Sequence, residues 1–173
     1  MKRVLALTLV LVMLFTLAAC GGATVKTGLG VITSTAKSKD VTAEADGTAQ
    51  VDTIVAAVTV DGSGKILAVD IDSAQTKVTF NAEGKLTAEL GGDVPTKTDL
   101  GDKYGMKAKS GIGKEWYEEI AAFETWLVGK TADQISGMKV TDGKVAEADL
   151  TSKVTITITD YQKAVLEAIQ NAK

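Results

Sequence analysis

The N-terminal segment of the chain limits what the rest can fold into. Lys2 and Arg3 precede an apolar run from Val4 to Leu17, and small residues lead from this run to Cys20. A charged start, an apolar run and small residues before a cleavage point are typical of a secretory signal, and the run is short for a membrane span. Because Cys20 is the only cysteine, the exported domain can form no internal disulfide and must be stable through its core alone.

The residues around Cys20 add a second interpretation to this segment. The tetrad Leu17-Ala18-Ala19-Cys20 resembles the lipobox of bacterial lipoproteins. The resemblance implies cleavage after Ala19 and a lipidated, palmitate-bearing Cys20, whose acyl chains would hold the domain at a bilayer. We therefore expect a signal peptide at 1–19 and a lipid-anchored protein on the extracytoplasmic side of the cell membrane. The alternative is an ordinary secretory signal with a chance cysteine.

Composition limits the chemistry of the mature chain. The full sequence has no histidine, a net charge of −3 and no polybasic stretch, and loss of Lys2 and Arg3 with the signal makes the charge about −5. Hydrolase triads, zinc sites and a nucleic-acid partner are therefore not expected, and we expect a binding or electron-transfer module without acid–base catalysis of its own. Asp70 and Asp72 alternate with apolar residues as on a half-buried strand, so we assign them to a solvated face and expect no metal site.

The hydrophobic pattern predicts one domain at 41–173 after a flexible, Gly- and Thr-rich spacer at 20–40. Turn signals at 61–64 and 81–84 separate strand patterns at 50–60, 65–72, 77–80 and 85–90. A helix presents an apolar stripe from Trp116 to Leu127, and capping boxes begin at Thr131 and Thr159. The order predicts an α+β fold, with an antiparallel sheet of about four to six strands and two or three helices packed on it.

The C-terminal part of the chain resembles a known family. The matching residues are Asp149, Ser152, Thr155, Thr157, Ala164 and Val165. They follow the C-terminal motif of FMN-binding domains, in which an Asp precedes Ser-Gly-Ala-Thr, a second Thr and a helix with an Ala-Val pair. The turn at 61–66, Asp-Gly-Ser-Gly-Lys-Ile, resembles the Asp-Gly-Lys-Ile turn near the start of that family.

The resemblance implies a flavoprotein in electron transport, with FMN as cofactor and a redox partner. It implies that Asp149, Ser152, Thr155 and Thr157 lie at the flavin. In lipoproteins of this family the residue equivalent to Thr155 can carry FMN covalently. Here Lys153-Val154 replaces the Gly-Ala of the motif, and a side chain there obstructs a flavin transferase, which argues against covalent attachment and favours a flavin-free protein. The alternation of apolar residues and threonines from 154 to 159 also fits a strand with a threonine face.

An insert at about 91–137 resembles one found in diverged exported lipoproteins of Firmicutes. It combines aromatic and cationic residues that suit a planar anionic cofactor, namely Tyr104, Tyr117, Lys97, Lys103 and Lys107. Trp116 lies on the apolar stripe, so we assign it to core packing rather than to stacking on a flavin. Two functions remain open: a membrane-tethered flavin electron-transfer module, or a flavin-free ligand- or protein-binding surface lipoprotein that keeps the fold.

Overall fold

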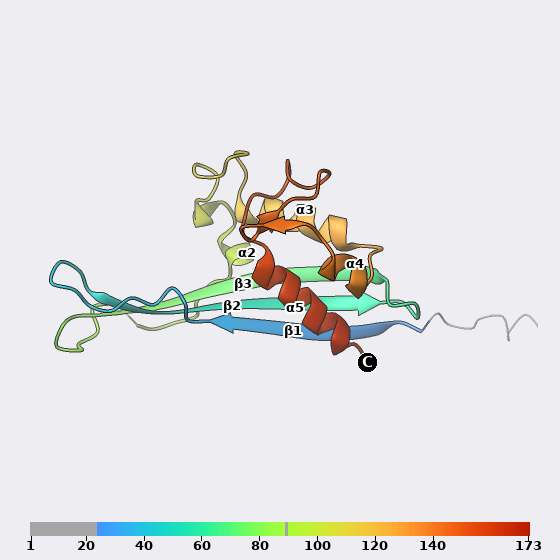
Figure 1. Cartoon of the computed structure of the whole chain (residues 1–173). Coiled ribbons are helices and arrows are strands. Elements are labelled where there is room, and N and C mark those ends of the chain that lie inside the picture. Colours follow the sequence, from blue (N-terminus) through green and yellow to red (C-terminus); the bar gives the residue numbers. More distant parts are fainter. Residues whose placement is uncertain (1–23, 89) are drawn as a thin grey trace, which may run out of the picture.

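The computed structural model describes residues 24–88 and 90–173, so the signal segment and Cys20 lie outside the described residues. The α+β class is confirmed (Figure 1). A three-stranded antiparallel sheet has the order β1-β2-β3, and a separate two-stranded sheet pairs β4 with β5. The strands are β1 (Lys26–Ser34), β2 (Gly47–Val60), β3 (Ile66–Phe80), β4 (Val140–Thr141) and β5 (Lys144–Val145). The helices are α2 (Lys97–Leu100), the 3₁₀ helix η1 (Gly101–Tyr104), α3 (Trp116–Leu127), α4 (Ala132–Ser136) and α5 (Thr159–Gln170).

Two of the sequence-based boundaries were wrong. The proposed spacer at 20–40 contains β1, which pairs with β2 from Lys26↔Val60 to Ser34↔Asp52. The glycines of this segment suggested a flexible linker. In the structure Gly28 and Gly30 instead allow α5 to pack closely on β1. The patterns at 65–72 and 77–80 form one continuous strand, β3. Among the described residues 85–88 and 90 there is no strand beyond an isolated bridge from Phe80 to Leu86. The main sheet therefore has three strands rather than four to six.

The connection between β2 and β3 is the tight turn that the sequence predicts. The Asp61 carboxylate accepts hydrogen bonds from the Ser63 amide and hydroxyl and from the Lys65 amide. These bonds lower the pKa of Asp61 below its ordinary value. Gly64 adopts a φ of 79°, which glycine reaches without steric cost. The Asp-Gly-Ser-Gly segment is thus a hairpin turn, as expected.

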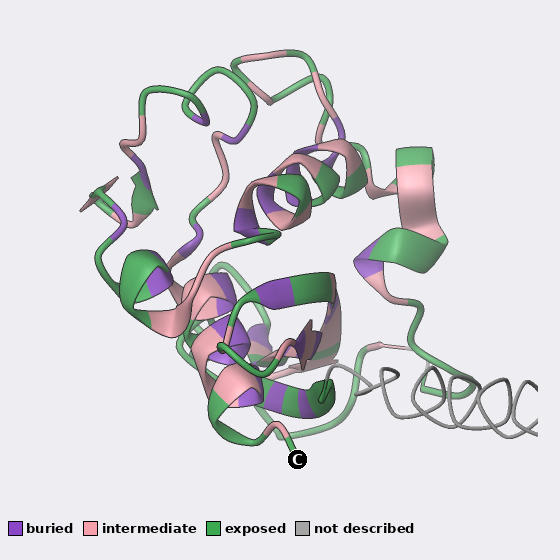
Figure 2. Cartoon of the chain, turned by 90° about the vertical axis from the view of Figure 1, so that its right-hand side faces the viewer, coloured by how far each residue is buried: buried purple, intermediate pink, exposed green. Residues whose placement is uncertain are grey.

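The helices cover one face of the main sheet (Figures 1 and 2). α5 crosses β1 and β2 so closely that a Cβ placed on Gly30 would lie 2.0 Å from the carbonyl oxygen of Ala164. Burial alternates along β2, where Ile54, Ala56, Val58 and Val60 point into the core. The other face of the sheet stays open, with Leu29 and Val31 of β1 exposed.

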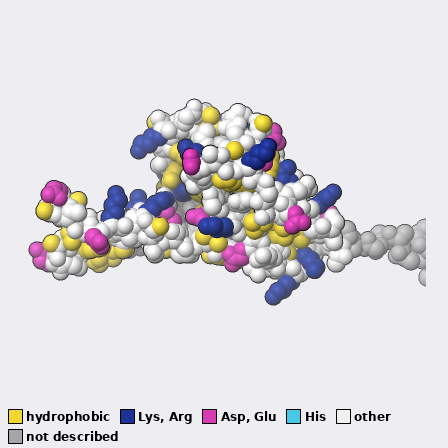
Figure 3. Space-filling view, viewed as in Figure 1, with side chains coloured by type: hydrophobic (Ala, Val, Ile, Leu, Met, Phe, Trp, Pro, Cys, Tyr) yellow, Lys and Arg dark blue, Asp and Glu magenta, His cyan; other side chains and the backbone are white. Residues whose placement is uncertain are grey.

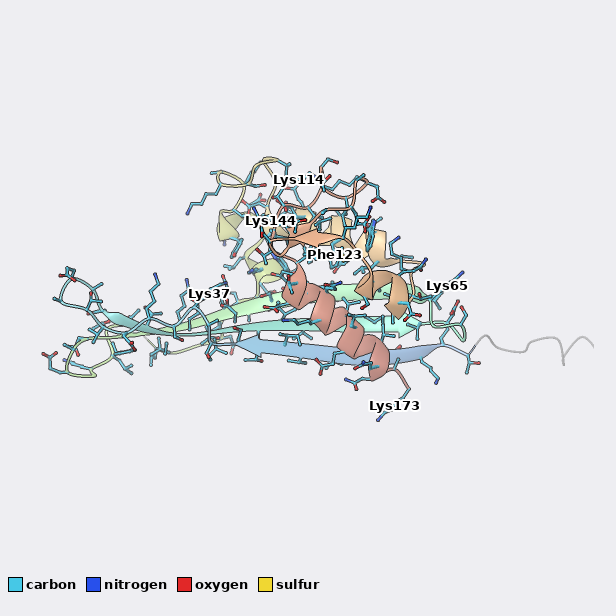
Figure 4. All side chains as sticks on the ribbon, in the orientation of Figure 1. Lys37, Lys65, Lys114, Phe123, Lys144 and Lys173 are labelled. Carbon is cyan, nitrogen blue, oxygen red and sulfur yellow. The ribbon has the colours of Figure 1, made fainter. Side chains whose placement is uncertain are left out.

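The helices α3, α4 and α5 begin and end close to their predicted positions, whereas α2 and η1 were not predicted. α3 buries Trp116, Ile120, Phe123 and Leu127, and Figure 4 shows Phe123 between α3 and the sheet. α4 has the predicted capping box from Thr131. The second predicted box is wrong, because α5 starts after Ile158 without a side-chain cap. The buried Ile158 donates its amide to the Gly143 carbonyl instead, so a tertiary contact sets this helix start.

None of the helices in the described part of the chain is long and apolar enough to span a membrane. The same residues contain no group of three or more potential metal ligands of the His, Cys, Asp and Glu types.

A half-buried glutamate in α3 is expected to make stability depend on pH. Glu124 accepts a 2.7 Å hydrogen bond from the Ile71 amide at the edge of β3. Burial raises the pKa of Glu124 from 4.5 to about 7; the Ile71 hydrogen bond opposes this rise, and Asp70 and Asp72 add to it. Because the folded pKa is raised, the protonated form contributes stability that is complete below about pH 4.5 and is lost as pH rises through 7.

We expect the free energy of unfolding to fall by about 1–2 kcal/mol between pH 5 and pH 8, after allowance for solvent screening of a half-exposed group. Glu124→Gln keeps the acceptor for Ile71 and should remove this fall. Urea denaturation of both proteins at the two pH values measures the difference. An equal fall in the variant would show that another group is responsible.

Candidate functional site

A polar cavity of about 280 Å³ lies between the end of β1, the helix-covered face of β2 and β3, and the start of α5. Its polar lining residues are Ser34, Lys37, Asp52, Ser73, Gln75, Lys97, Thr157, Asp160 and Tyr161. A second cavity of about 310 Å³ shares Gln75 and Lys97 with the first and also contacts Tyr104. Lys97 therefore stands where the two cavities meet, and we call the pair the Lys97 cavities.

Local structure brings Lys97 to this place. It is the first residue of α2, which begins with a capping box formed by Thr96 and Asp99. Thr96 bridges to Ala74 of β3, and the Thr98 amide donates to Asp72. These contacts hold the short helix against the edge of the sheet. They also turn the Lys97 side chain inward, where it is only 8% exposed.

The Lys97 ammonium is surrounded by aromatic side chains. Nζ donates to the Tyr161 hydroxyl at 3.2 Å and lies 5.0 Å and 5.1 Å from the ring centroids of Tyr104 and Trp116. Within 24–88 and 90–173 the ion pairs are Lys37–Asp52 and Lys163–Asp160, so Lys97 has no carboxylate within 4.0 Å. Such a buried, uncompensated charge is costly and is suited to an anionic ligand.

Burial lowers the pKa of Lys97 from 10.5 to about 8. The Lys37 ammonium lowers it as well, whereas the carboxylates of Asp52 and Asp72 raise it. Burial raises the pKa of Tyr161 to about 12, against the hydrogen bond from Trp116. At neutral pH the site therefore presents a mainly protonated amine beside a neutral phenol.

A polar network forms the outer wall of the first cavity. Lys37 forms a 2.6 Å ion pair with Asp52, which also accepts from Gln50 and Gln75. Burial acts to raise the pKa of Asp52, but the hydrogen bonds from Lys37 and Gln50 hold it below its ordinary value. Figure 3 shows lysines gathered where the uncovered end of the sheet joins the body, and Figure 4 places Lys37 there.

The motif that resembles FMN-binding domains is built around a buried carboxylate. Glu119 of α3 is fully buried and accepts from the amide and hydroxyl of Thr155, the amide of Ile156 and the hydroxyl of Ser110. The Thr155 hydroxyl lies 3.0 Å from Glu119 Oε1. These donors are already occupied by the Glu119 carboxyl group. A flavin bound at Thr155 would have to displace these contacts, so this position does not fit a covalent flavin.

Three of the nine residues named as possible cofactor contacts lie at the Lys97 cavities, namely Thr157, Tyr104 and Lys97. The other six lie elsewhere: Thr155 faces Glu119, Asp149 accepts from Trp126 Nε1, Tyr117 donates to Asp102, and Lys103, Lys107 and Ser152 are exposed. Trp116 is 1% exposed and belongs to the core, as expected.

Several residues of the site were not predicted from the sequence, among them Tyr161, Lys37, Asp52 and Gln75. Tyr161 was assigned only to the apolar stripe of the last helix. One signal was present, because Tyr161, the first residue of that stripe, carries a hydroxyl, and a buried hydroxyl requires a hydrogen-bond partner. No local pattern indicates that Asp52, in the middle of a strand, pairs with Lys37 across a chain reversal.

The comparisons with known proteins give little about function. No family model matches the chain, and no solved structure matches it. A segment of 40 residues is 45% identical to a chlorophenol reductase from Desulfitobacterium hafniense. This segment is 23% of the chain and 12% of that protein. The similarity covers too little of the reductase to carry its activity over, and the FMN-binding resemblance remains a hypothesis.

Proposed function

We propose that this chain is a lipid-anchored extracytoplasmic protein whose domain binds a small planar anion, with FMN as the ligand that the family resemblance implies. The observation that carries the proposal is the Lys97 ammonium, which is buried, flanked by aromatic rings and without a carboxylate partner among the described residues, where two cavities meet. A charge in that setting is stabilised when an anion enters the cavity.

The residues at the Lys97 cavities fit a non-covalent flavin better than those at Thr155. The two cavities, about 280 and 310 Å³, share lining residues, and ligand sites commonly have volumes of about 300–1,000 Å³. Lys97 and Lys37 supply positive charge for a phosphate, and Tyr104 and Thr157 supply a ring and a hydroxyl. When bound, the flavin itself would carry the electrons, and the protein would orient it and tune its potential.

A flavin-free binding lipoprotein is the second candidate function. It is favoured by the Glu119 contacts, which occupy the amide and hydroxyl of Thr155 within the motif. In that case the same ammonium would hold another small acid, and the fold would serve as a carrier without redox chemistry. The two candidates differ in whether flavin is retained by the folded domain.

A titration of FMN into the domain by flavin fluorescence tests the proposal. Lys97→Met should weaken binding by about 10- to 100-fold, because a hydrogen bond to a charged group contributes roughly 1.5–3 kcal/mol. Lys109→Met, an exposed lysine of the same insert, is the matched control and should bind like the wild type. Equal affinities of the two variants, or no FMN binding by the wild type, would reject the flavin assignment.

The same titration should depend on pH. The Lys97 ammonium is lost as pH rises through about 8, so affinity for an anion should fall between pH 7 and pH 9. Lys37, Asp52, Asp72, Tyr104 and Tyr161 are the other charged or titratable groups around it. The pKa of each tyrosine is raised by burial, and that of Asp52 is lowered, so these three groups are not expected to titrate in this interval. A fall that persists in Lys97→Met would contradict this assignment.

A further inference from the structure

Four lysines surround the end of the sheet where β1 begins, and we call this the lysine end. Lys26, Lys65 and Lys173 are exposed and Lys130 is half-buried. Figure 4 shows Lys65 and Lys173 at this end of the molecule, opposite the uncovered tip where β2 starts and β3 ends. The four residues are far apart in the sequence, so only the fold brings them together.

Backbone contacts establish that grouping. Lys26 pairs with Val60, the last residue of β2 before the turn that contains Lys65. The Lys173 amide donates to the Thr27 carbonyl at 3.3 Å. The Lys130 carbonyl accepts from the Ile66 amide at 2.9 Å, beside the start of β3. All four lysines therefore belong to one edge of the domain.

The same edge exposes large apolar side chains. About half of each of these side chains is exposed: Val25 54%, Leu67 48% and Val128 49%. Val25 directly precedes Lys26, Leu67 follows Ile66, and Val128 precedes Gly129. The Gly129 amide donates to the Ile66 carbonyl, which places Val128 next to the start of β3. Exposed apolar residues among lysines suit the boundary between lipid headgroups and acyl chains.

The charges differ between the two ends of the sheet. Asp61, whose oxygen is bonded within its own turn, and Asp133 lie within four residues of a lysine of this end, and Asp70, Glu124 and Glu167 lie within six. At the opposite tip Glu44, Asp46 and Glu83 line a shallow hollow, and Figure 3 shows acidic side chains there. An anionic surface would therefore attract the lysine end more strongly than the tip, which carries these three carboxylates together with Lys85.

We propose that the lysine end is a membrane-docking surface that rests on the anionic headgroups of the bilayer that holds the Cys20 lipid. The inference rests on the lipid anchor of the proposed function. Five residues separate Cys20 from Lys26, so even a fully extended chain would keep β1 within about 20 Å of the anchor. The anchor and the lysines act on the same edge, and two membrane signals together hold a protein more firmly than one.

The test couples the chain from Cys20 onward to a maleimide lipid through the Cys20 thiol, in vesicles of phosphatidylcholine with or without phosphatidylglycerol. This chain keeps every core residue, since the core lies between Ile54 and Ala168. Exposed lysines are acetylated with a water-soluble reagent, and mass spectrometry measures the labelling rate of each. Lys85, in the turn at the opposite tip, is the internal control.

In vesicles with phosphatidylglycerol, Lys26, Lys65 and Lys173 should be labelled at least about fivefold more slowly than in solution, while Lys85 should be unchanged. The double variant Lys26→Glu, Lys65→Glu should abolish the protection of Lys173, and the control Lys85→Glu should preserve it. Uniform labelling of all lysines, or equal protection in neutral vesicles, would overturn the headgroup contact. The mass of protein from membranes of the producing cell separately tests the lipid on Cys20, so failure of the anchor and failure of the surface are distinguishable.

Discussion

Replacing Glu119 by alanine is expected to lower the free energy of unfolding by about 3–5 kcal/mol, the cost of removing one member of a buried, charge-assisted hydrogen-bond cluster. The carboxylate is fully buried and accepts from the Thr155 amide and hydroxyl, the Ile156 amide and the Ser110 hydroxyl. Without it, backbone amides in the segment before α5 lose their acceptor. The largest effect should fall on that segment, which carries Thr157 to the Lys97 cavities.

Urea denaturation measures the loss in stability, and amide hydrogen exchange at Thr155 and Ile156 locates it. Glu119→Gln retains one acceptor oxygen and should lose less than the alanine variant. Glu83→Gln, in the exposed turn of the opposite tip, is the control and should change stability by less than about 0.5 kcal/mol. A loss in Glu119→Ala no larger than that of the control would show that the cluster contributes little to folding.

Replacing Gly30 by valine is expected to destabilise the domain by at least about 3 kcal/mol, because the added side chain cannot be accommodated between β1 and α5. An ideal Cβ at this position would lie 2.0 Å from the Ala164 carbonyl oxygen and 2.8 Å from the Ala168 amide nitrogen. Both are backbone atoms of a helix and cannot rotate away. The helix would have to move off the sheet and expose Val165 and Ala168 of its buried face.

Thermal unfolding followed by circular dichroism measures this effect. Gly111→Ala is the matched control, since a Cβ there has no atom within 4 Å and the backbone is not left-handed. It should leave the melting temperature nearly unchanged. If Gly30→Val unfolds at the wild-type temperature, α5 is not packed on β1 as closely as the structure describes.

Features that depend on residues close together in the sequence could be predicted, and features that depend on distant residues could not. The turn at Asp61, the stripe of α3 and the cap at Thr131 depend on residues a few positions apart, and each was predicted. The strand at 26–34 was missed because its glycines suit a spacer equally well. These glycines are needed because α5, more than a hundred residues later in the chain, packs directly against them.

The candidate site shows the same division. The insert was recognised as a carrier of aromatic and cationic residues, and Tyr104 and Lys97 do lie at the cavities. Nothing local distinguishes Lys97 from Lys107, although one is buried and the other is exposed. Burial depends on the docking of α2 against β3 and on the rings of Trp116 and Tyr161, which come from two other helices.

The sequence by itself determined the α+β class, the positions of α3 and α4 and the tight turns, because periodicity and capping act over one or two turns of chain. It also supplied the proposed secretory and lipid signal. Only the tertiary structure decided that Thr155 faces a buried carboxylate, that Lys97 lies between two cavities without a carboxylate within 4.0 Å among the described residues, and that four separate lysines share one end. Each of these properties arises from contacts between elements distant in the chain, and such contacts leave no periodic trace in the sequence.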